Sequence, residues 1–386
     1  MLRNSFPLLI KPASFSCNLQ CKHCFYSLKT HGNGSQKQLH MSGKTLHRLI
    51  KMYLALPLER HVFIWQGGEP TLMGLQFFTH AVQYQKQYAT KAHTIENCLQ
   101  TNGTLITKDF SKFLARNHFL VGVSIDGPKH LHDFYRTYPT DKGSYQKVMD
   151  NLGLMQKDGV NVNALTLLTA NNVQHAADIF HHLTTKHILH HQYIPCVEFQ
   201  PDGSPAPWAV DPLEWGKALC SLFDLWLEAR GRVSVRYFDA LLYTLMSGRP
   251  GICHMDNRCG QYAVVEYDGS IYPCDFFVSP QWKLGNIHET SWQEIWQHPL
   301  YTAFGQGKKT NSEKCSSCQW VGLCAGDCQK HRIGAYSTAH SQHSWLCNGY
   351  RLFFEYAVPI LRRLAGPTRL PEAALPEVPE GNVNAG

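Results

Sequence analysis

Three cysteines stand close together near the start of the chain, in the stretch CNLQCKHCFY at residues 17–26, with the spacing C-x3-C-x2-C. A structural zinc site uses four ligands, and this stretch supplies three. A [4Fe-4S] cluster has four irons, so Cys17, Cys21 and Cys24 would hold three of them and leave the fourth open to a chelating molecule. The stretch therefore predicts a cluster with one vacant iron.

The alternative for this stretch is a zinc knuckle that a further residue completes. His23 is the obvious candidate for the fourth ligand, but it lies between Cys21 and Cys24 and would have to bind from inside a two-residue loop. That geometry is poor for a tetrahedral ion. We therefore favour the cluster.

Eight further cysteines lie between residues 253 and 347 and form two groups. The first group includes CGQYAVVEYDGSIYPC at 259–274, with the spacing C-x9-G-x4-C. The second includes CSSCQWVGLCAGDC at 315–328, with the spacing C-x2-C-x5-C-x3-C. Eight thiolates suffice for two four-cysteine sites, but their spacing alone does not separate iron from zinc. The remaining cysteines stand in apolar patterns typical of a protein core: Cys98, Cys196 and Cys220.

The composition and charge of the chain limit the classes of protein to which it could belong. The chain has 386 residues, 44% of them hydrophobic, which is enough for a large core. The net charge of +7 is scattered, without the dense basic run that follows a nucleic acid backbone. No stretch approaches the roughly 18 to 20 apolar residues of a membrane helix, and the N-terminus shows no signal-peptide pattern. We therefore expect a cytoplasmic protein, with no nucleic acid or membrane partner, in which clustered cysteines hold metal.

Strand-like and helical patterns alternate from residue 7 to about 200. We expect strands at 7–14, 61–66, 94–100, 119–126, 160–168 and 190–198, with helices between them, one of which begins after Ser42 and another at Ser144. Six β/α units are too few to close an eight-stranded barrel. They predict an α/β fold, either a partial TIM-like (β/α)6 barrel or a doubly wound sheet. In both, functional groups gather at the carboxyl ends of the strands.

The remainder of the chain has a different composition. We expect the barrel at residues 1–200, a linker with helices at 201–250 and a small cysteine-rich domain at 251–348. A helix at 349–365 and a disordered tail at 366–386 would follow. Within the cysteine-rich domain, Asp268 and Gly269 predict the turn of a hairpin.

The cysteine triplet, followed by an aromatic pair and by GGEP at 67–70, resembles the radical S-adenosylmethionine (SAM) enzymes. The resemblance implies that the methionine part of SAM chelates the open iron and that the reduced cluster cleaves SAM to a 5'-deoxyadenosyl radical. Glycines also allow a backbone to approach a ligand closely. The SAM contacts implied are Gly67, Gly68 and Glu69 at the methionine amino group, Tyr26 near the adenine and Ser124 at the ribose or carboxylate, with Gln66 and Arg136 as further candidates.

The later cysteines resemble the SPASM domain of radical SAM peptide-modifying enzymes, which carries two auxiliary [4Fe-4S] clusters with interleaved ligands. The resemblance therefore implies three [4Fe-4S] clusters in all. It assigns Cys253, Cys259, Cys274 and Cys328 to the first auxiliary cluster, and Cys315, Cys318, Cys324 and Cys347 to the second.

Across nearly its whole length the chain resembles anaerobic sulfatase-maturating enzymes, in stretches such as KPASFSCNLQCKHCFY, FIWQGGEPTLMGLQFF and VGVSIDGPKHLHDFYR. These enzymes convert a cysteine or serine in a sulfatase Cys/Ser-x-Pro-x-Arg motif to formylglycine. The radical takes a hydrogen from Cβ, a base removes the thiol or hydroxyl proton, and an electron leaves toward an auxiliary cluster. The resemblance implies that Asp275, directly after Cys274, is this base and that Gln100 could reach the substrate peptide. In an unknown protein Asp275 would be read as a turn residue.

Two other interpretations remain open from the sequence. One is another SPASM maturase that forms thioether cross-links or epimerises residues. The other is a non-enzymatic zinc-binding interaction protein, for which six β/α units would have no purpose. The sulfatase interpretation implies two partners, an unfolded or nascent sulfatase polypeptide and an electron donor such as flavodoxin or ferredoxin. The sequence does not indicate whether the target residue is cysteine or serine.

Overall fold

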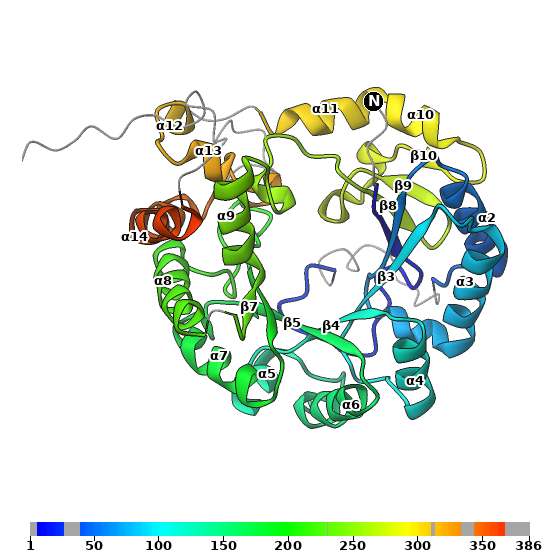
Figure 1. Cartoon of the computed structure of the whole chain (residues 1–386), viewed down its shortest axis with the longest axis horizontal. Coiled ribbons are helices and arrows are strands. Elements are labelled where there is room, and N and C mark those ends of the chain that lie inside the picture. The colour runs from blue at the N-terminus through cyan, green and yellow to red at the C-terminus, as the bar shows by residue number, and fades with distance from the viewer. Residues whose placement is uncertain (1–5, 27–38, 230, 310–312, 333–342, 367–386) are drawn as a thin grey trace, which may run out of the picture.

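The structure is a computed structural model that describes residues 6–26, 39–229, 231–309, 313–332 and 343–366. Its central feature is one ten-stranded sheet that curves into part of a barrel, with helices around the outside (Figure 1). The strand order is β10-β9-β8-β1-β2-β3-β4-β5-β6-β7, and the sheet is open because β7 and β10 do not pair with each other. The strands are β1 (Leu8–Lys11), β2 (Arg60–Trp65), β3 (Thr94–Thr101), β4 (Leu120–Ser124), β5 (Asn161–Leu168), β6 (His190–Pro195), β7 (Ser234–Val235), β8 (Ala263–Glu266), β9 (Ser270–Tyr272) and β10 (Gly285–Asn286).

Strands β1 to β7 run parallel, each beside the next, so their carboxyl ends open at one mouth. The six strands expected from the sequence are present as β1 to β6, and the partial barrel is confirmed. The short β7 was not predicted. Strand β2 illustrates the pattern that forms these strands. Its alternate residues Phe63 and Trp65 are buried on the side of the helix layer, where the Trp65 ring packs edge-on against Phe77 and Phe78.

Helices cover the outer face of the sheet, and α2, α3, α4, α6 and α7 follow one another around it (Figure 1). Helix α2 begins after Ser42, as predicted, and the Ser42 side chain accepts a hydrogen bond from the Thr45 amide at 3.1 Å. The α-helices of the described residues are α2 (Gly43–Leu54), α3 (Gly74–Tyr88), α4 (Lys108–Arg116), α5 (Lys129–Tyr135), α6 (Tyr145–Lys157), α7 (Ala176–Thr185), α8 (Pro212–Glu228), α9 (Arg236–Ser247), α10 (Trp292–Gln297), α11 (Pro299–Gly307), α12 (Glu313–Ser316), α13 (Val321–Cys324) and α14 (Cys347–Ala365).

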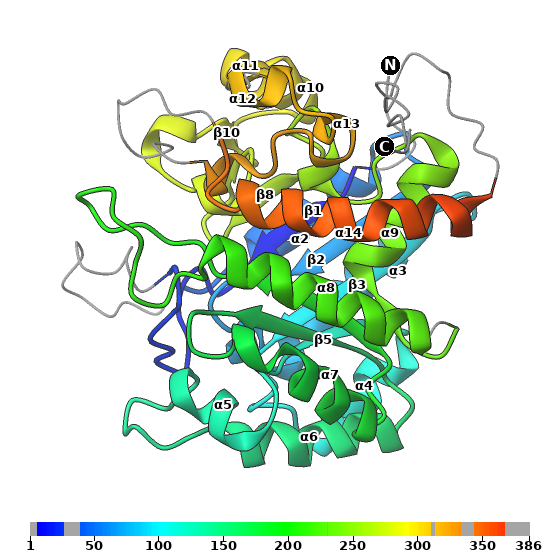
Figure 2. The same ribbon diagram turned by 90° about the vertical axis from the view of Figure 1, so that its left-hand side faces the viewer.

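The cysteine-rich segment extends the same sheet instead of standing apart from it. Strand β8 pairs in parallel with β1, and β9 returns antiparallel to β8 across the predicted turn at Asp268 and Gly269, where Gly269 has a φ of +86°. Helices α10 to α13 gather beside this end of the sheet (Figure 2). The domain boundaries at residues 200, 250 and 348 stay a prediction, and the expected tail, from residue 367 onward, lies outside the described residues.

Helix α14 lies along α8 on the outside of the molecule (Figure 2). Their contact requires glycine on both sides, because a Cβ at Gly349 would lie 1.9 Å from the Pro212 carbonyl oxygen and one at Gly216 would lie 2.6 Å from the Gly349 carbonyl oxygen. No helix among the described residues is long and apolar enough to cross a membrane.

We expect Gly349→Ala to lower the free energy of unfolding by about 3 kcal/mol, because the new methyl group meets backbone that cannot rotate away. Denaturant unfolding followed by circular dichroism measures this change. Gly153→Ala in α6 is the matched control, since a Cβ there meets nothing within 4 Å. It should be neutral or stabilise by about 0.5 kcal/mol. Equal stabilities for the two variants would contradict the close contact.

Candidate active site

The loop after β1 carries the three N-terminal cysteines and packs against the loop after β2. The amide of Gly68 donates to the Ser14 carbonyl at 2.7 Å, and the amide of Glu69 donates to the Ser16 carbonyl at 2.8 Å. A Cβ at Gly67 would lie 2.5 Å from the Ser14 oxygen, and one at Gly68 would lie 2.2 Å from the Ser16 oxygen. The two glycines are therefore required for loop-to-loop packing, whatever ligand they also contact.

The thiols of this loop are close neighbours, with Cys17 exposed and Cys21 and Cys24 partly exposed. Loss of contact with solvent, followed by the Glu69 carboxylate and the thiols of Cys21 and Cys24, raises the pKa of Cys17 to about 12. Burial likewise raises the pKa of Cys21 to about 11. Thiolates at such a site need cationic partners, and a set made only of thiols fits an iron–sulfur cluster. Within the described residues no three metal-binding side chains form the ligand shell of a single ion.

Glu69 is completely buried and joins the ends of β2 and β3. Its Oε1 accepts hydrogen bonds from the Thr71 amide at 3.0 Å, the Thr71 hydroxyl at 2.5 Å and the Thr101 hydroxyl at 2.8 Å, while its Oε2 accepts from the Asn102 amide at 2.7 Å. The Asn102 side chain in turn donates to the Cys17 sulfur at 3.6 Å. Four hydrogen bonds thus hold the carboxylate beside the loop of three cysteines, and its role toward SAM stays a prediction.

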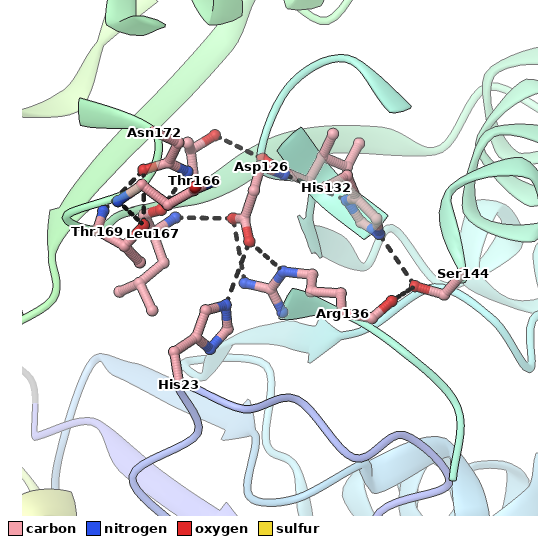
Figure 3. A network of polar contacts seen from close by, with 11 residues as sticks. His23, Asp126, His132, Arg136, Ser144, Thr166, Leu167, Thr169 and Asn172 are labelled. Atoms are coloured by element: carbon pink, nitrogen blue, oxygen red, sulfur yellow. Dashed lines mark hydrogen bonds and ion pairs between the residues drawn. The ribbon is translucent and has the colours of Figure 1, made fainter. Parts of the chain in front are cut away.

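Asp126, just after β4, is the centre of a second polar network (Figure 3). The Arg136 guanidinium donates to both carboxylate oxygens, with Nε at 2.6 Å and Nη2 at 3.2 Å, and the Leu167 amide donates at 2.9 Å. Arg136 also lies near Cys21 and lowers the pKa of that thiol. The His23 ring lies 3.4 Å from Asp126 and points toward it, so the structure does not support His23 as a fourth zinc ligand.

Asp126 was missed by sequence reasoning, although it lies in the same SIDG stretch as Ser124. We expect Asp126→Asn to lower the free energy of unfolding by about 3 kcal/mol or more, since Arg136 then stays buried without a counter-charge. Urea unfolding measures the loss. The control is Asp178→Asn, at an exposed aspartate paired only with His175, which should change stability by less than about 0.5 kcal/mol. A small effect at Asp126 would show that Arg136 is readily solvated.

Asp275 lies at the same mouth, at the start of a short 3-10 helix (Asp275–Phe277), and is 4% exposed. The Tyr26 hydroxyl donates to both of its oxygens at 3.0 Å, and the Gln66 side-chain amide donates to Oδ2 at 3.0 Å. The Lys11 ammonium lies 3.2 Å from Oδ1. Burial, together with Asp275, raises the pKa of Tyr26 well above its usual value, so the phenol stays protonated and donates.

Tyr26 and Gln66 both contact Asp275 in this structure, and their expected contacts with SAM stay a prediction. Lys11 was not singled out from the sequence. The signal for Lys11 is a charged residue that ends the buried strand LLIK at the mouth of the barrel. Gln100 on β3 lies beside Gly122 of β4, and Ser124 ends β4, so both are near the mouth as expected.

The eight later cysteines form two neighbourhoods. Burial, with smaller contributions from Asp275 and Cys253, raises the pKa of Cys274 to about 12. Cys274 and Cys253 also contribute to the raised pKa of Cys328, and Cys259 contributes to that of Cys253, so these four thiols are neighbours. The second neighbourhood lines a cavity of about 800 Å³, which has room for a cubane. The cysteines lining that cavity are Cys315, Cys318, Cys324 and Cys347.

Known proteins are similar to this chain in sequence. Family models for the radical SAM superfamily and for the SPASM iron–sulfur cluster-binding domain match residues 12–183 and 253–319. The cysteine-type anaerobic sulfatase-maturating enzyme of Clostridium perfringens strain 13 is 36% identical over 362 residues, which cover 93% of this chain and 98% of that enzyme. The serine-type enzyme of Bacteroides thetaiotaomicron is 33% identical, and the alignment covers 92% of this chain and 90% of that enzyme.

A solved structure shows the same likeness in three dimensions. Native anSMEcpe with bound AdoMet and Cp18Cys peptide matches with a TM-score of 0.86 at 37% identity, over 93% of this chain and 98% of that one. The similarity in sequence and in fold therefore covers nearly the full length of each protein. The chain is a radical SAM enzyme with a SPASM domain, and it belongs to the family of anaerobic sulfatase-maturating enzymes.

Proposed function

We propose that this enzyme oxidises a cysteine or serine in a sulfatase Cys/Ser-x-Pro-x-Arg motif to Cα-formylglycine. The observation that carries the proposal is Asp275, a buried carboxylate that directly follows Cys274 and lies at the mouth that also holds the three N-terminal thiols. The relatives named for sulfatase maturation include both cysteine and serine types, so either target residue is compatible with the family.

The cofactors in this proposal are SAM and three [4Fe-4S] clusters. The N-terminal triplet would hold the first cluster, the set with Cys274 and Cys328 the second, and the four cysteines of the 800 Å³ cavity the third. Gly67, Gly68, Glu69, Ser124 and Arg136 would hold SAM. When bound, SAM and the reduced first cluster would supply the radical that takes one hydrogen atom from the target Cβ, and an auxiliary cluster would take up one electron.

The protein's own residues supply the remaining parts of the reaction. Asp275 accepts the proton of the target thiol or hydroxyl, and Tyr26 and Gln66 hold its carboxylate in place. Loss of one hydrogen atom, one proton and one electron converts CH2–SH to a thioaldehyde, or CH2–OH to the aldehyde directly. Water then replaces the sulfur of the thioaldehyde, which releases hydrogen sulfide.

The test is anaerobic incubation of the reconstituted enzyme with SAM, a reductant and paired peptides that differ only in a cysteine or serine at the target position. Mass spectrometry should show a loss of about 18 Da from the cysteine peptide or about 2 Da from the serine peptide. Cleavage of SAM with neither change would overturn the proposal. A loss of about 2 Da from a cysteine peptide, with the sulfur retained in a cross-link, would favour another SPASM maturase.

The partners in this proposal are an unfolded or nascent sulfatase polypeptide and a small electron-transfer protein such as flavodoxin or ferredoxin. A solved relative with a bound peptide supports the first partner. The second follows from the chemistry, since each cleavage of SAM consumes one electron. SAM cleavage driven by reduced flavodoxin, with no chemical reductant present, would support it.

A further inference from the structure

Lys11 is a buried cation that touches two carboxylates at the mouth of the barrel. Its ammonium lies 2.9 Å from the Glu266 carboxylate and 3.2 Å from that of Asp275, and the three side chains are 2%, 8% and 5% exposed. The Tyr26 ring lies beneath the ammonium, with its centre 4.4 Å away. Burial by itself lowers the pKa of Lys11, but Asp275 and Glu266 outweigh it and raise the pKa, so the ammonium stays charged.

The register of the sheet sets this arrangement. Lys11 ends β1 and is paired across the ladder with Glu266, which ends β8. Parallel strands place such neighbours side by side on one face, so the ion pair is fixed by the backbone. The backbone of Gly67 lies beside Lys11, since a Cβ built there would be 3.5 Å from the Lys11 Cβ. The strand register and the Glu266 ion pair hold the Lys11 ammonium beside Asp275.

The two oxygens of Asp275 differ in the charge of their donors. Oδ1 receives the Lys11 ammonium and the Tyr26 hydroxyl, whereas Oδ2 receives the Gln66 amide and shares the Tyr26 hydroxyl. A carboxylate has about four lone-pair sites, and three donors serve them here, since the single Tyr26 proton is shared between the two oxygens. A substrate proton is accepted most easily at the oxygen whose donors can withdraw. The neutral donors on Oδ2 can do so at a smaller cost than a buried ammonium.

We propose that Lys11, anchored by Glu266, is a positioning residue that holds Oδ1 of Asp275 and leaves Oδ2 to accept the substrate proton. This inference rests on the proposed function, in which Asp275 is the proton acceptor. It makes the junction of β1 and β8 part of the active site. The carboxylate is carried by the cysteine-rich segment, and its orientation is set by the first strand of the barrel.

The experiment measures two products of the same incubation, aldehyde in the peptide and 5'-deoxyadenosine from SAM. For Lys11→Met we expect the ratio of aldehyde to 5'-deoxyadenosine to fall about 100-fold, the usual effect of misplacing a reacting group by about 1 Å. A purely structural role would lower both products together and leave the ratio unchanged. Because the ratio counts only molecules that cleave SAM, incomplete folding or loss of the first cluster does not affect it.

Two variants of Glu266 provide the matched comparison. Glu266→Gln keeps an oxygen that accepts from Lys11 and should stay within about 3-fold of the wild-type ratio, whereas Glu266→Leu removes the anchor and should lower the ratio about 10-fold. An unchanged ratio in Lys11→Met would overturn the inference. If that variant cleaves no SAM, equal ratios in the two Glu266 variants would overturn it. Wild-type enzyme that cleaves SAM without forming aldehyde would count against the proposed function itself.

Discussion

Asp275→Asn should lower aldehyde formation by about 1,000-fold while 5'-deoxyadenosine is still produced, because an amide cannot take up the proton of the target thiol or hydroxyl. The substitution keeps the size of the side chain. It also turns one acceptor of the Tyr26, Gln66 and Lys11 contacts into a donor, which disturbs the surrounding hydrogen bonds. Both products are measured from one anaerobic reaction by liquid chromatography and mass spectrometry.

The control for this prediction is Asp268→Asn. Asp268 lies in the nearby hairpin turn, where its side chain accepts hydrogen bonds from the amide and hydroxyl of Ser270, and it does not contact Asp275. We expect this variant to form aldehyde at a rate within about 2-fold of the wild type. Wild-type aldehyde formation by Asp275→Asn would show that another group removes the proton.

Replacement of Cys17, Cys21 and Cys24 together by alanine should abolish SAM cleavage and lower the iron content from about 12 to about 8 atoms per chain. The reason is that the two later cysteine sets are separate neighbourhoods and share no ligand with the triplet. Iron analysis and the absorbance of the anaerobically reconstituted protein measure the loss.

Cys220→Ala is the control for the triple variant, because Cys220 lies on α8 and belongs to none of the three sets. It should retain about 12 irons and full SAM cleavage. A triple variant that still holds 12 irons would show that the N-terminal cysteines are not cluster ligands. One that loses all its iron would show that the later sites depend on the first.

Most of the secondary structure of the barrel could be predicted from the local sequence pattern. The apolar runs of β1 to β6 are long and bounded by turn residues, and the Asp268-Gly269 turn fixes the hairpin. The sequence could not show that β8 pairs with β1, since that pairing joins residues far apart in the chain and local periodicity carries no information about it.

The chemistry of the candidate site was visible only in part. Cysteine spacing groups the candidate ligands into sets, but for the eight later cysteines it does not separate iron from zinc. Spacing does not give hydrogen-bond partners, and the contact of Tyr26 with Asp275 was not predicted. Lys11 and Asp126 were missed because each acquires its role from partners on other strands, which are Glu266 for Lys11 and Leu167 for Asp126. Such residues are identified only once the pairing of the strands is known.

The pairing of β1 with both β2 and β8 has a consequence for biosynthesis. During translation β1 can pair with β2 early, but its other edge stays bare until the segment from Ala263 has left the ribosome. An unpaired strand edge is a template for pairing with strands of other chains. The loop that carries the three thiols directly follows β1. The nascent chain is therefore most exposed to aggregation and oxidation before its C-terminal third emerges, and we expect cluster loading to follow the completion of the sheet.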